Sequence, residues 1–362
     1  MGRELSDLIG ASLDFYHRYL DARGITSPQL QELLTPFMAA AEARTPELMA
    51  MITGMAEGAT VPVMELFAVN AFEELEPLLE RVGGHPLFLE KKGGAPARPG
   101  GDGAESREAG PEKLERCTSF AVRAEGRTLL GHNEQWLAGD AGNVAVVIER
   151  PGPGHTTLAS PVSVCCLPSV GINEHGIAMG IQSLTASDDG VGVPRVLVSR
   201  TVLGSGNLDE VVRNASATGR SGGYGYSVAA RGGRTLTIET SATRMSTTEG
   251  DGAHTNHYLD PQLAAGAPEP ASGSAARYEH IAAALADRSP TTPEEAMSLL
   301  REHGSDRTAG SVCIHPDEAD GDDAECIVFS LVAEVESGRL WVAAGNPCEH
   351  EFHEIDLTGM RA

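Results

Sequence analysis

The chain has 362 residues, of which 41% are hydrophobic, so it can bury one large core or two smaller ones. Its formal net charge of −24 would repel a phosphate backbone, which argues against nucleic-acid binding. No apolar run approaches the roughly 20 residues that a membrane span needs, so we expect no membrane partner. The charged first residues lack a secretory apolar stretch and the six cysteines form no C-x-x-C pair. We therefore expect a cytoplasmic protein with free thiols.

The first quarter of the chain has the pattern of a helical segment. Apolar residues between Leu5 and Leu13 recur at helical spacing. Ser27 is a suitable N-cap for a second helix because a proline follows it at the first helical position. Two more helices are expected up to about Glu80, so residues 1–90 are predicted to form one helical segment.

Residues 91–116 are rich in Gly, Pro, Ala and Glu, and we expect a mobile linker there because so little apolar area could offset its ordering entropy. The remaining chain, residues 117–362, has mostly strand patterns. Strands are expected at 118–122, 128–130, 144–149, 163–166, 177–183, 225–231, 234–240, 310–315, 325–333 and 339–344, and helices at 194–203, 208–216, 273–286 and 293–302. This order indicates an α+β fold in which two sheets lie between helix layers.

Cys117 opens the first predicted strand directly after the linker. If the peptide bond before it broke, Cys117 would carry a free α-amine with an unperturbed pKa of roughly 7.7–8. Such an amine can act as a base for the thiol of the same residue, so nucleophile and base would come as one unit. From position alone, a buried strand cysteine is the more common explanation.

Further motifs change that balance. In chain order they are ITGMAEG at 52–58, LFAVN at 66–70, CTSF at 117–120, GHNEQW at 131–136, GINEHGI at 171–177, HTNH at 254–257 and the run 307–317. Together they resemble the isopenicillin-N acyltransferase-like family, which includes acyl-CoA:6-aminopenicillanate acyltransferase and consists of autoproteolytic N-terminal nucleophile hydrolases. The resemblance implies a four-layer αββα sandwich preceded by a helical pro-segment.

The resemblance also implies roles for single residues. Cys117 falls on the family's nucleophile, which first cleaves the chain after Arg116 and later takes an acyl group from the substrate. The mature protein would then be an α/β heterodimer or a higher oligomer. Asn256 falls on an oxyanion-stabilising asparagine, a contribution of roughly 2.7–4 kcal/mol in known enzymes. Arg307 falls on an arginine that contacts a substrate carboxylate, which a guanidinium binds through two hydrogen bonds.

Two positions depart from the family. Gln135 stands where the penicillin-forming relative has a substrate-contacting Asp, so we expect a different amine acceptor. Glu134 could supply a carboxylate instead, although strand alternation would point it the other way. Arg116 stands where that relative has a glycine, whose freedom to adopt strained geometry could help cleavage.

Two histidine-containing patterns could suggest a metal site. His254 and His257 have H-x-x-H spacing but no third ligand at a typical distance. Cys348, His350 and His353 lie where a proline more commonly starts a turn. We therefore expect no metal and no other cofactor.

The sequence thus predicts a self-cleaving cysteine amidohydrolase or acyltransferase that acts through a Cys117 thioester. Its small-molecule partner would be an N-acyl or aminoacyl amide, or an acyl-CoA. The alternative is a non-catalytic binding module with the same fold, which the departures at Arg116 and Gln135 favour.

Overall fold

A computed structural model describes residues 1–83, 116–150, 152, 155–304, 310–317 and 321–357. The predicted linker, residues 91–116, lies outside the described residues except for Arg116.

The N-terminal part is helical, as the sequence predicts. It consists of α1 (Ser6–Ala22), α2 (Ser27–Arg44), α3 (Pro46–Ala59), α4 (Val63–Asn70) and α5 (Phe72–Gly83). The N-cap of α2 is Thr26, which forms a capping box with Gln29, and not the expected Ser27. The single helix predicted after α3 is divided into α4 and α5. Asn70 ends α4. Its buried side chain donates a hydrogen bond to the backbone carbonyl of Cys165 and accepts one from the backbone N–H of Leu167, both in a distant loop.

Thirteen strands form two antiparallel sheets within the described residues. The first sheet has the order β10-β1-β2-β11-β12-β13 and the second has the order β3-β4-β5-β6-β7-β8-β9. The strands are β1 (Thr118–Ala124), β2 (Arg127–Leu137), β3 (Val144–Glu149), β4 (Leu158–Ser163), β5 (Gly171–Asn173), β6 (Ile177–Leu184), β7 (Gly223–Ala230), β8 (Arg234–Thr240), β9 (Met245–Glu249), β10 (Gly252–His254), β11 (Glu325–Glu334), β12 (Arg339–Ala344) and β13 (His353–Asp356).

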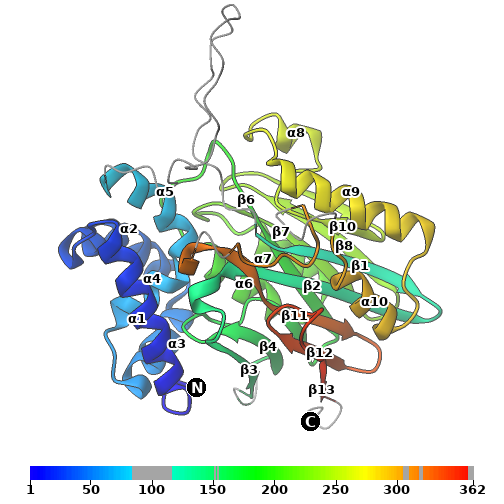
Figure 1. The fold of residues 1–362 in the computed structure, drawn as a ribbon, viewed down its shortest axis with the longest axis horizontal. Coiled ribbons are helices and arrows are strands. Elements are labelled where there is room, and N and C mark those ends of the chain that lie inside the picture. Colours follow the sequence, from blue (N-terminus) through cyan, green and yellow to red (C-terminus); the bar gives the residue numbers. More distant parts are fainter. Residues whose placement is uncertain (84–115, 151, 153–154, 305–309, 318–320, 358–362) are drawn as a thin grey trace, which may run out of the picture.

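The two sheets pack face to face and helices cover their outer sides (Figure 1). Strands β1 and β2 contact β6 and β7 across the interior. Helices α9 (Ser272–Asp287) and α10 (Pro293–Leu300) cover the first sheet, and α6 (Arg195–Leu203) and α7 (Leu208–Ala215) cover the second. The predicted α+β fold, a four-layer αββα sandwich with helices before it, is confirmed.

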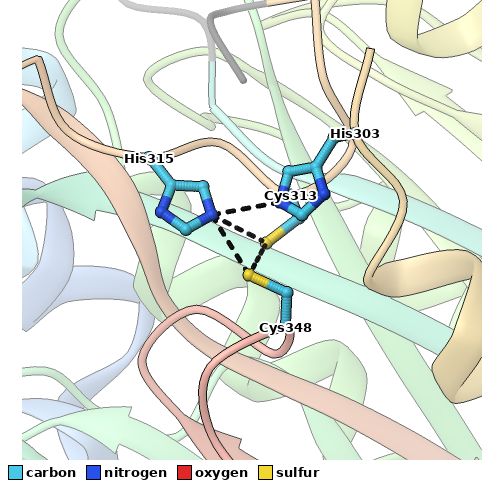
Figure 2. Close-up of side chains that lie close together, drawn as sticks. All are labelled: His303, Cys313, His315 and Cys348. Atoms are coloured by element: carbon cyan, nitrogen blue, oxygen red, sulfur yellow. Dashed lines mark hydrogen bonds between the residues drawn. The ribbon is translucent and has the colours of Figure 1, made fainter. Parts of the chain in front are cut away.

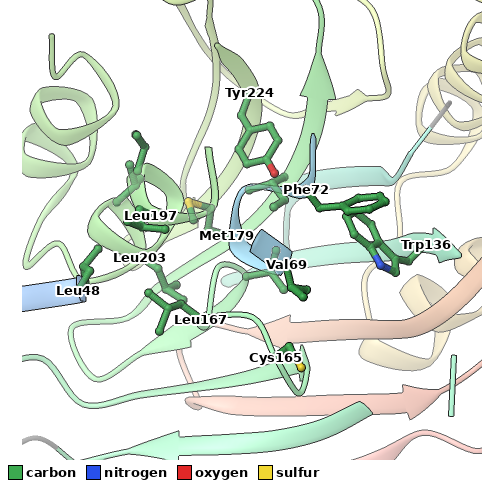
Figure 3. Packing of buried hydrophobic residues seen from close by; sticks show 14 of the residues in the cluster. Leu48, Val69, Phe72, Trp136, Cys165, Leu167, Met179, Leu197, Leu203 and Tyr224 are labelled. Carbon is green, nitrogen blue, oxygen red and sulfur yellow. The ribbon is translucent and has the colours of Figure 1, made fainter. Parts of the chain in front are cut away.

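The N-terminal helices share one hydrophobic core with the sandwich. Figure 3 shows Val69 and Phe72 near Met179, Tyr224 and Trp136, which belong to strands of both sheets. Because burial of apolar area contributes about 25 cal/mol per Å², this shared core ties the two parts of the chain strongly together.

Several short strands were not expected from the sequence. Strands β5, β9, β10 and β13 have only three to five residues, too few to show a periodic pattern. The strand expected at 163–166 instead ends at Ser163, as part of β4, and residues 164–166 form a turn.

The strand expected at 310–315 is absent. This segment is irregular, and its carbonyl groups at Val312 and Ile314 accept hydrogen bonds from the side chains of Asn133 and Asn346.

Candidate active site

Cys117 lies directly before β1, which runs between β10 and β2 in the first sheet, and it is 3% exposed. Strands β1 and β2 pair Thr118 with Asn133, and the same register continued by one residue puts Cys117 opposite Glu134. Burial raises the pKa of the Cys117 thiol well above its usual range, and the Glu134 carboxylate raises it further. In the uncut chain the thiol is therefore protonated at neutral pH.

The backbone is strained at Cys117. Its φ is 76°, in the left-handed region that residues with a side chain rarely adopt. Such a conformation costs about 1–3 kcal/mol and persists only where the surrounding structure imposes it. The penicillin-forming relative has a glycine before its nucleophile, where strained geometry is easily adopted. In this chain the strain lies at the cysteine itself.

A hydrogen-bonded row of side chains runs from Cys117 into the sheet. Glu134 Oε2 lies 2.8 Å from His132 Nε2, and His132 Nδ1 lies 2.7 Å from Ser119 Oγ, which also accepts from Gln182. The Cys117 sulfur, one His132 nitrogen and a Glu134 oxygen lie within 4.8 Å of one another. His132 joins Ser119 and Glu134 through its two ring nitrogens, so we interpret the row as an acid–base relay.

The position of Glu134 corrects the expectation from strand alternation, which turned it away from the site. Strands β1 and β2 pair in unbroken register up to Thr118 and Asn133, so Glu134 shares the face of Cys117 and of His132, two residues before it. Alternation along β2 therefore holds, and the expectation was wrong because it put Gln135, and not Glu134, on the face of Cys117.

Asn256 lies on the other side of Cys117. The register of β1 and β10, continued two residues past its last pair, puts Asn256 opposite Cys117. Arg277, whose side chain is fully buried, donates from Nη2 to Asn256 Oδ1 at 2.7 Å. This contact fixes which end of the amide carries the donors, and Asn256 Nδ2 donates to Ser183 O at 3.3 Å. An amide held in this way can donate to a developing oxyanion.

The histidines beside Asn256 have structural partners. His254 Nε2 lies 2.9 Å from Glu239 Oε1 and its Nδ1 lies 2.6 Å from Thr255 O, so neither nitrogen is available to a metal. His257 Nδ1 lies 2.9 Å from Ser274 Oγ. The H-x-x-H spacing therefore does not define a metal site.

Arg116 occupies a buried acidic pocket next to Cys117. Only 2% of its surface is exposed, Nη2 bonds Glu76 Oε1 at 2.7 Å, and Nε lies 3.5 Å from Glu325 Oε1. The guanidinium carbon lies 4.2 Å from the ring centroid of Trp136. Burial raises the pKa of Glu76 to about 7 although Arg116 opposes this shift, and burial also raises the pKa of Glu73 and of Glu325.

Gln135 faces this acidic pocket. Its side chain is 2% exposed and Nε2 donates to Glu325 Oε2 at 2.5 Å. From the sequence we expected the neutral Gln135 to leave the site without a negative charge. In the structure Glu73 and Glu76 of α5 and Glu325 of β11 supply carboxyl groups there. Sequence reasoning missed these carboxylates because no local motif joins the two segments. Arg307 lies outside the described residues.

Two sheets between helix layers, with a buried cysteine at the head of a strand of one sheet, define the N-terminal nucleophile hydrolase architecture. Residues 122–349, more than half of the chain, match the acyl-coenzyme A:6-aminopenicillanic acid acyl-transferase family. The chain belongs to this family, which is a family of acyl-transferase enzymes.

Solved structures similar to the chain have low sequence identity. Penicillin V acylase from Agrobacterium tumefaciens is 18% identical with a TM-score of 0.46, over 67% of this chain and 86% of that one. A variant of conjugated bile acid hydrolase from Clostridium perfringens is 12% identical with a TM-score of 0.46, over 67% of this chain and 93% of that one. The Caenorhabditis elegans N-acylethanolamine-hydrolyzing acid amidase ortholog is 12% identical with a TM-score of 0.42, over 60% of this chain and 92% of that one. No curated protein matches the sequence.

A membrane-spanning helix is not found in the part of the chain that the structure describes, where every helix is too short or too polar to cross a bilayer.

Proposed function

We propose that the protein is a self-cleaving cysteine amidohydrolase or acyltransferase whose nucleophile, Cys117, is unmasked by scission of the bond after Arg116. The observation that carries the proposal is the junction itself: a strained cysteine with φ of 76°, buried beside Glu134. A structural cysteine needs neither the strain nor a carboxylate partner.

Self-cleavage in the uncut chain requires a base other than the α-amine, because that amine is still part of the peptide bond. Glu134 is placed to take the thiol proton, and His132 holds its carboxylate in position. The Cys117 sulfur attacks the Arg116 carbonyl carbon, a C–S bond forms, and the C–N bond breaks. The proton passes to the leaving amine. Water then hydrolyses the thioester, which leaves a carboxylate on Arg116 and a thiol and an amine on Cys117.

In the mature enzyme the Cys117 amine serves as the base for the same sulfur. The Asn256 amide, oriented by Arg277, donates to the oxyanion formed on the substrate carbonyl. Release of the amine leaves a thioester, which water resolves in hydrolysis and an amine resolves in transfer. We favour hydrolysis, because the substrate-contacting aspartate of the penicillin-forming relative is replaced here by Gln135, whose amide is engaged with Glu325.

The pocket around Arg116 suggests the substrate class. In self-cleavage Arg116 is the acyl part of the chain's own first substrate, so its side chain marks where a later acyl side chain would lie. Glu76 and Glu325 pair with its guanidinium, and Trp136 stacks on it. We propose that the enzyme prefers amides of cationic acyl groups, such as arginyl or lysyl amides.

Self-cleavage is tested by the mass of the purified protein. Two fragments that meet at Arg116 and Cys117 support the proposal, and a Cys117→Ala variant should remain full-length and inactive while still folded. A single inert full-length species after long incubation would instead favour the non-catalytic binding module. Incubation of an N-acyl amide with and without an added amine separates hydrolysis from transfer.

A further inference from the structure

Four possible metal ligands converge away from the active site. His303 follows α10, Cys313 and His315 lie in the segment that leads towards β11, and Cys348 follows β12. Figure 2 shows the two sulfurs and the two imidazoles pointing toward one another. One nitrogen or sulfur atom from each residue lies within 4.8 Å of every other.

The spacing of these atoms fits a tetrahedral zinc site. Zinc bonds of about 2.3 Å to sulfur and about 2.0–2.1 Å to nitrogen give tetrahedron edges of about 3.8 Å between sulfurs and about 3.3 Å between nitrogens. The sulfurs of Cys313 and Cys348 are 3.6 Å apart, and Nε2 of His303 and Nε2 of His315 are 3.1 Å apart. His315 Nε2 lies 3.8 Å from Cys313 Sγ and 3.1 Å from Cys348 Sγ.

The surrounding residues also suit a metal. His315 Nδ1, the nitrogen that faces away from the cluster, lies 3.5 Å from Glu349 Oε1. A carboxylate on the outer nitrogen of a histidine ligand fixes the ring and raises its basicity. Asn346 Nδ2 donates to Cys313 Sγ at 3.4 Å, which would stabilise a thiolate. Cys313 is buried and the other three ligands are half-buried, so bulk water is largely excluded.

We propose that His303, Cys313, His315 and Cys348 bind one zinc ion in a closed structural site. With four protein ligands no position remains for a substrate or a catalytic water. The ion joins the segment after α10 to the turn after β12. It also supports the active-site strand, because Asn133 of β2, the neighbour of Glu134, donates from Nδ2 to Val312 O at 2.9 Å.

A disulfide between Cys313 and Cys348 is the competing explanation. A disulfide requires a sulfur separation of about 2.05 Å, whereas these sulfurs are 3.6 Å apart with a histidine nitrogen beside both. The sequence pattern of Cys348 with His350 and His353 is a second competitor. His350 Nδ1 lies 3.1 Å from Asn346 O, outside the cluster, and His353 pairs its backbone with β12.

Metal content of the full chain, purified after growth with zinc, tests the proposal. We expect one zinc per chain, and X-ray absorption should give two sulfur and two nitrogen neighbours. His315→Gln and Cys348→Ser should lower the zinc content at least tenfold. The matched controls His350→Gln and Cys117→Ala should retain one zinc, which separates the site from the sequence pattern and from the active site.

Cobalt provides a second readout that does not depend on enzyme activity. Wild-type protein stripped of metal and titrated with Co²⁺ should develop the visible bands of tetrahedral cobalt and a thiolate-to-cobalt charge-transfer band. His315→Gln should lose this pattern while its circular dichroism stays that of a folded protein. Unchanged zinc content in His315→Gln, a metal-free wild type without cobalt bands, or a Cys313–Cys348 disulfide in the protein as isolated would each overturn the proposal.

Discussion

Replacing Glu76 by glutamine removes the closest anionic partner of the Arg116 guanidinium and keeps nearly the same side-chain volume. In the structure Glu76 Oε1 lies 2.7 Å from Arg116 Nη2, and the Arg116 side chain is 2% exposed. If the pocket binds the cationic acyl side chain of a substrate, Glu76→Gln weakens that binding and leaves a neutral side chain of the same shape nearly unaffected.

The expected size follows from the contacts that remain. Hydrogen bonds to charged groups contribute about 1.5–3 kcal/mol, and loss of one partner of a buried ion pair costs about 3–5 kcal/mol. The Glu325 carboxylate, 3.5 Å from Arg116 Nε, and the ring of Trp136 stay in place. We therefore expect Glu76→Gln to weaken binding of the cationic side chain by about 2 kcal/mol. That is about a 30-fold fall in selectivity.

The assay compares kcat/KM for an arginyl amide with that for the citrullyl amide, a neutral isostere. The ratio should fall about 30-fold in Glu76→Gln. It should stay unchanged in the control Glu65→Gln, whose carboxylate lies 3.2 Å from His17 on the surface of the helical part. An unchanged ratio in Glu76→Gln, with self-cleavage intact, would refute the assignment of the pocket to the substrate.

The pH dependence has a definite sign. Burial raises the pKa of Glu76 to about 7 with Arg116 in place, and without a cation the pKa would be higher still. Below that pH the carboxyl is neutral and binds a cation weakly, and above it the carboxylate forms the ion pair. The arginyl preference in kcat/KM should therefore increase as the pH rises from about 7 upward, and Glu76→Gln should flatten this increase.

Three further predictions test the other contacts. Glu134→Gln should slow self-cleavage about 100-fold, since a general base contributes about 10²–10⁴, and a fragment time course on gels with wild-type kinetics would exclude Glu134 as the base. Asn256→Ala should lower kcat about 10²–10³-fold with little change in KM, and a changed KM alone would indicate a binding role instead. Tyr16→Phe should lower the melting temperature by a few degrees, because the buried Trp136 Nε1 loses its acceptor at 2.6 Å, and calorimetry showing equal melting would contradict this.

The long periodic elements of the fold were predictable from the sequence. Helices α1, α2, α9 and α10 and strands β6, β8 and β11 carry regular apolar patterns over at least seven residues. Strands β5 and β10 have only three residues each, and they exist because long neighbours offer them hydrogen bonds. Local patterns cannot reveal such strands, since their stability comes from pairing across the sheet.

For the site, the sequence by itself determined the chemistry placed on one short stretch: Cys117 at the head of a strand, with Arg116 before it. Family motifs added Asn256. Only the tertiary structure brought Glu134 to the thiol, gathered acidic residues of α5 and β11 around Arg116, and grouped two cysteines and two histidines from separate loops. The reason is physical: burial and ion pairing act between residues far apart in the chain, and their partners are set by packing and not by spacing along the sequence.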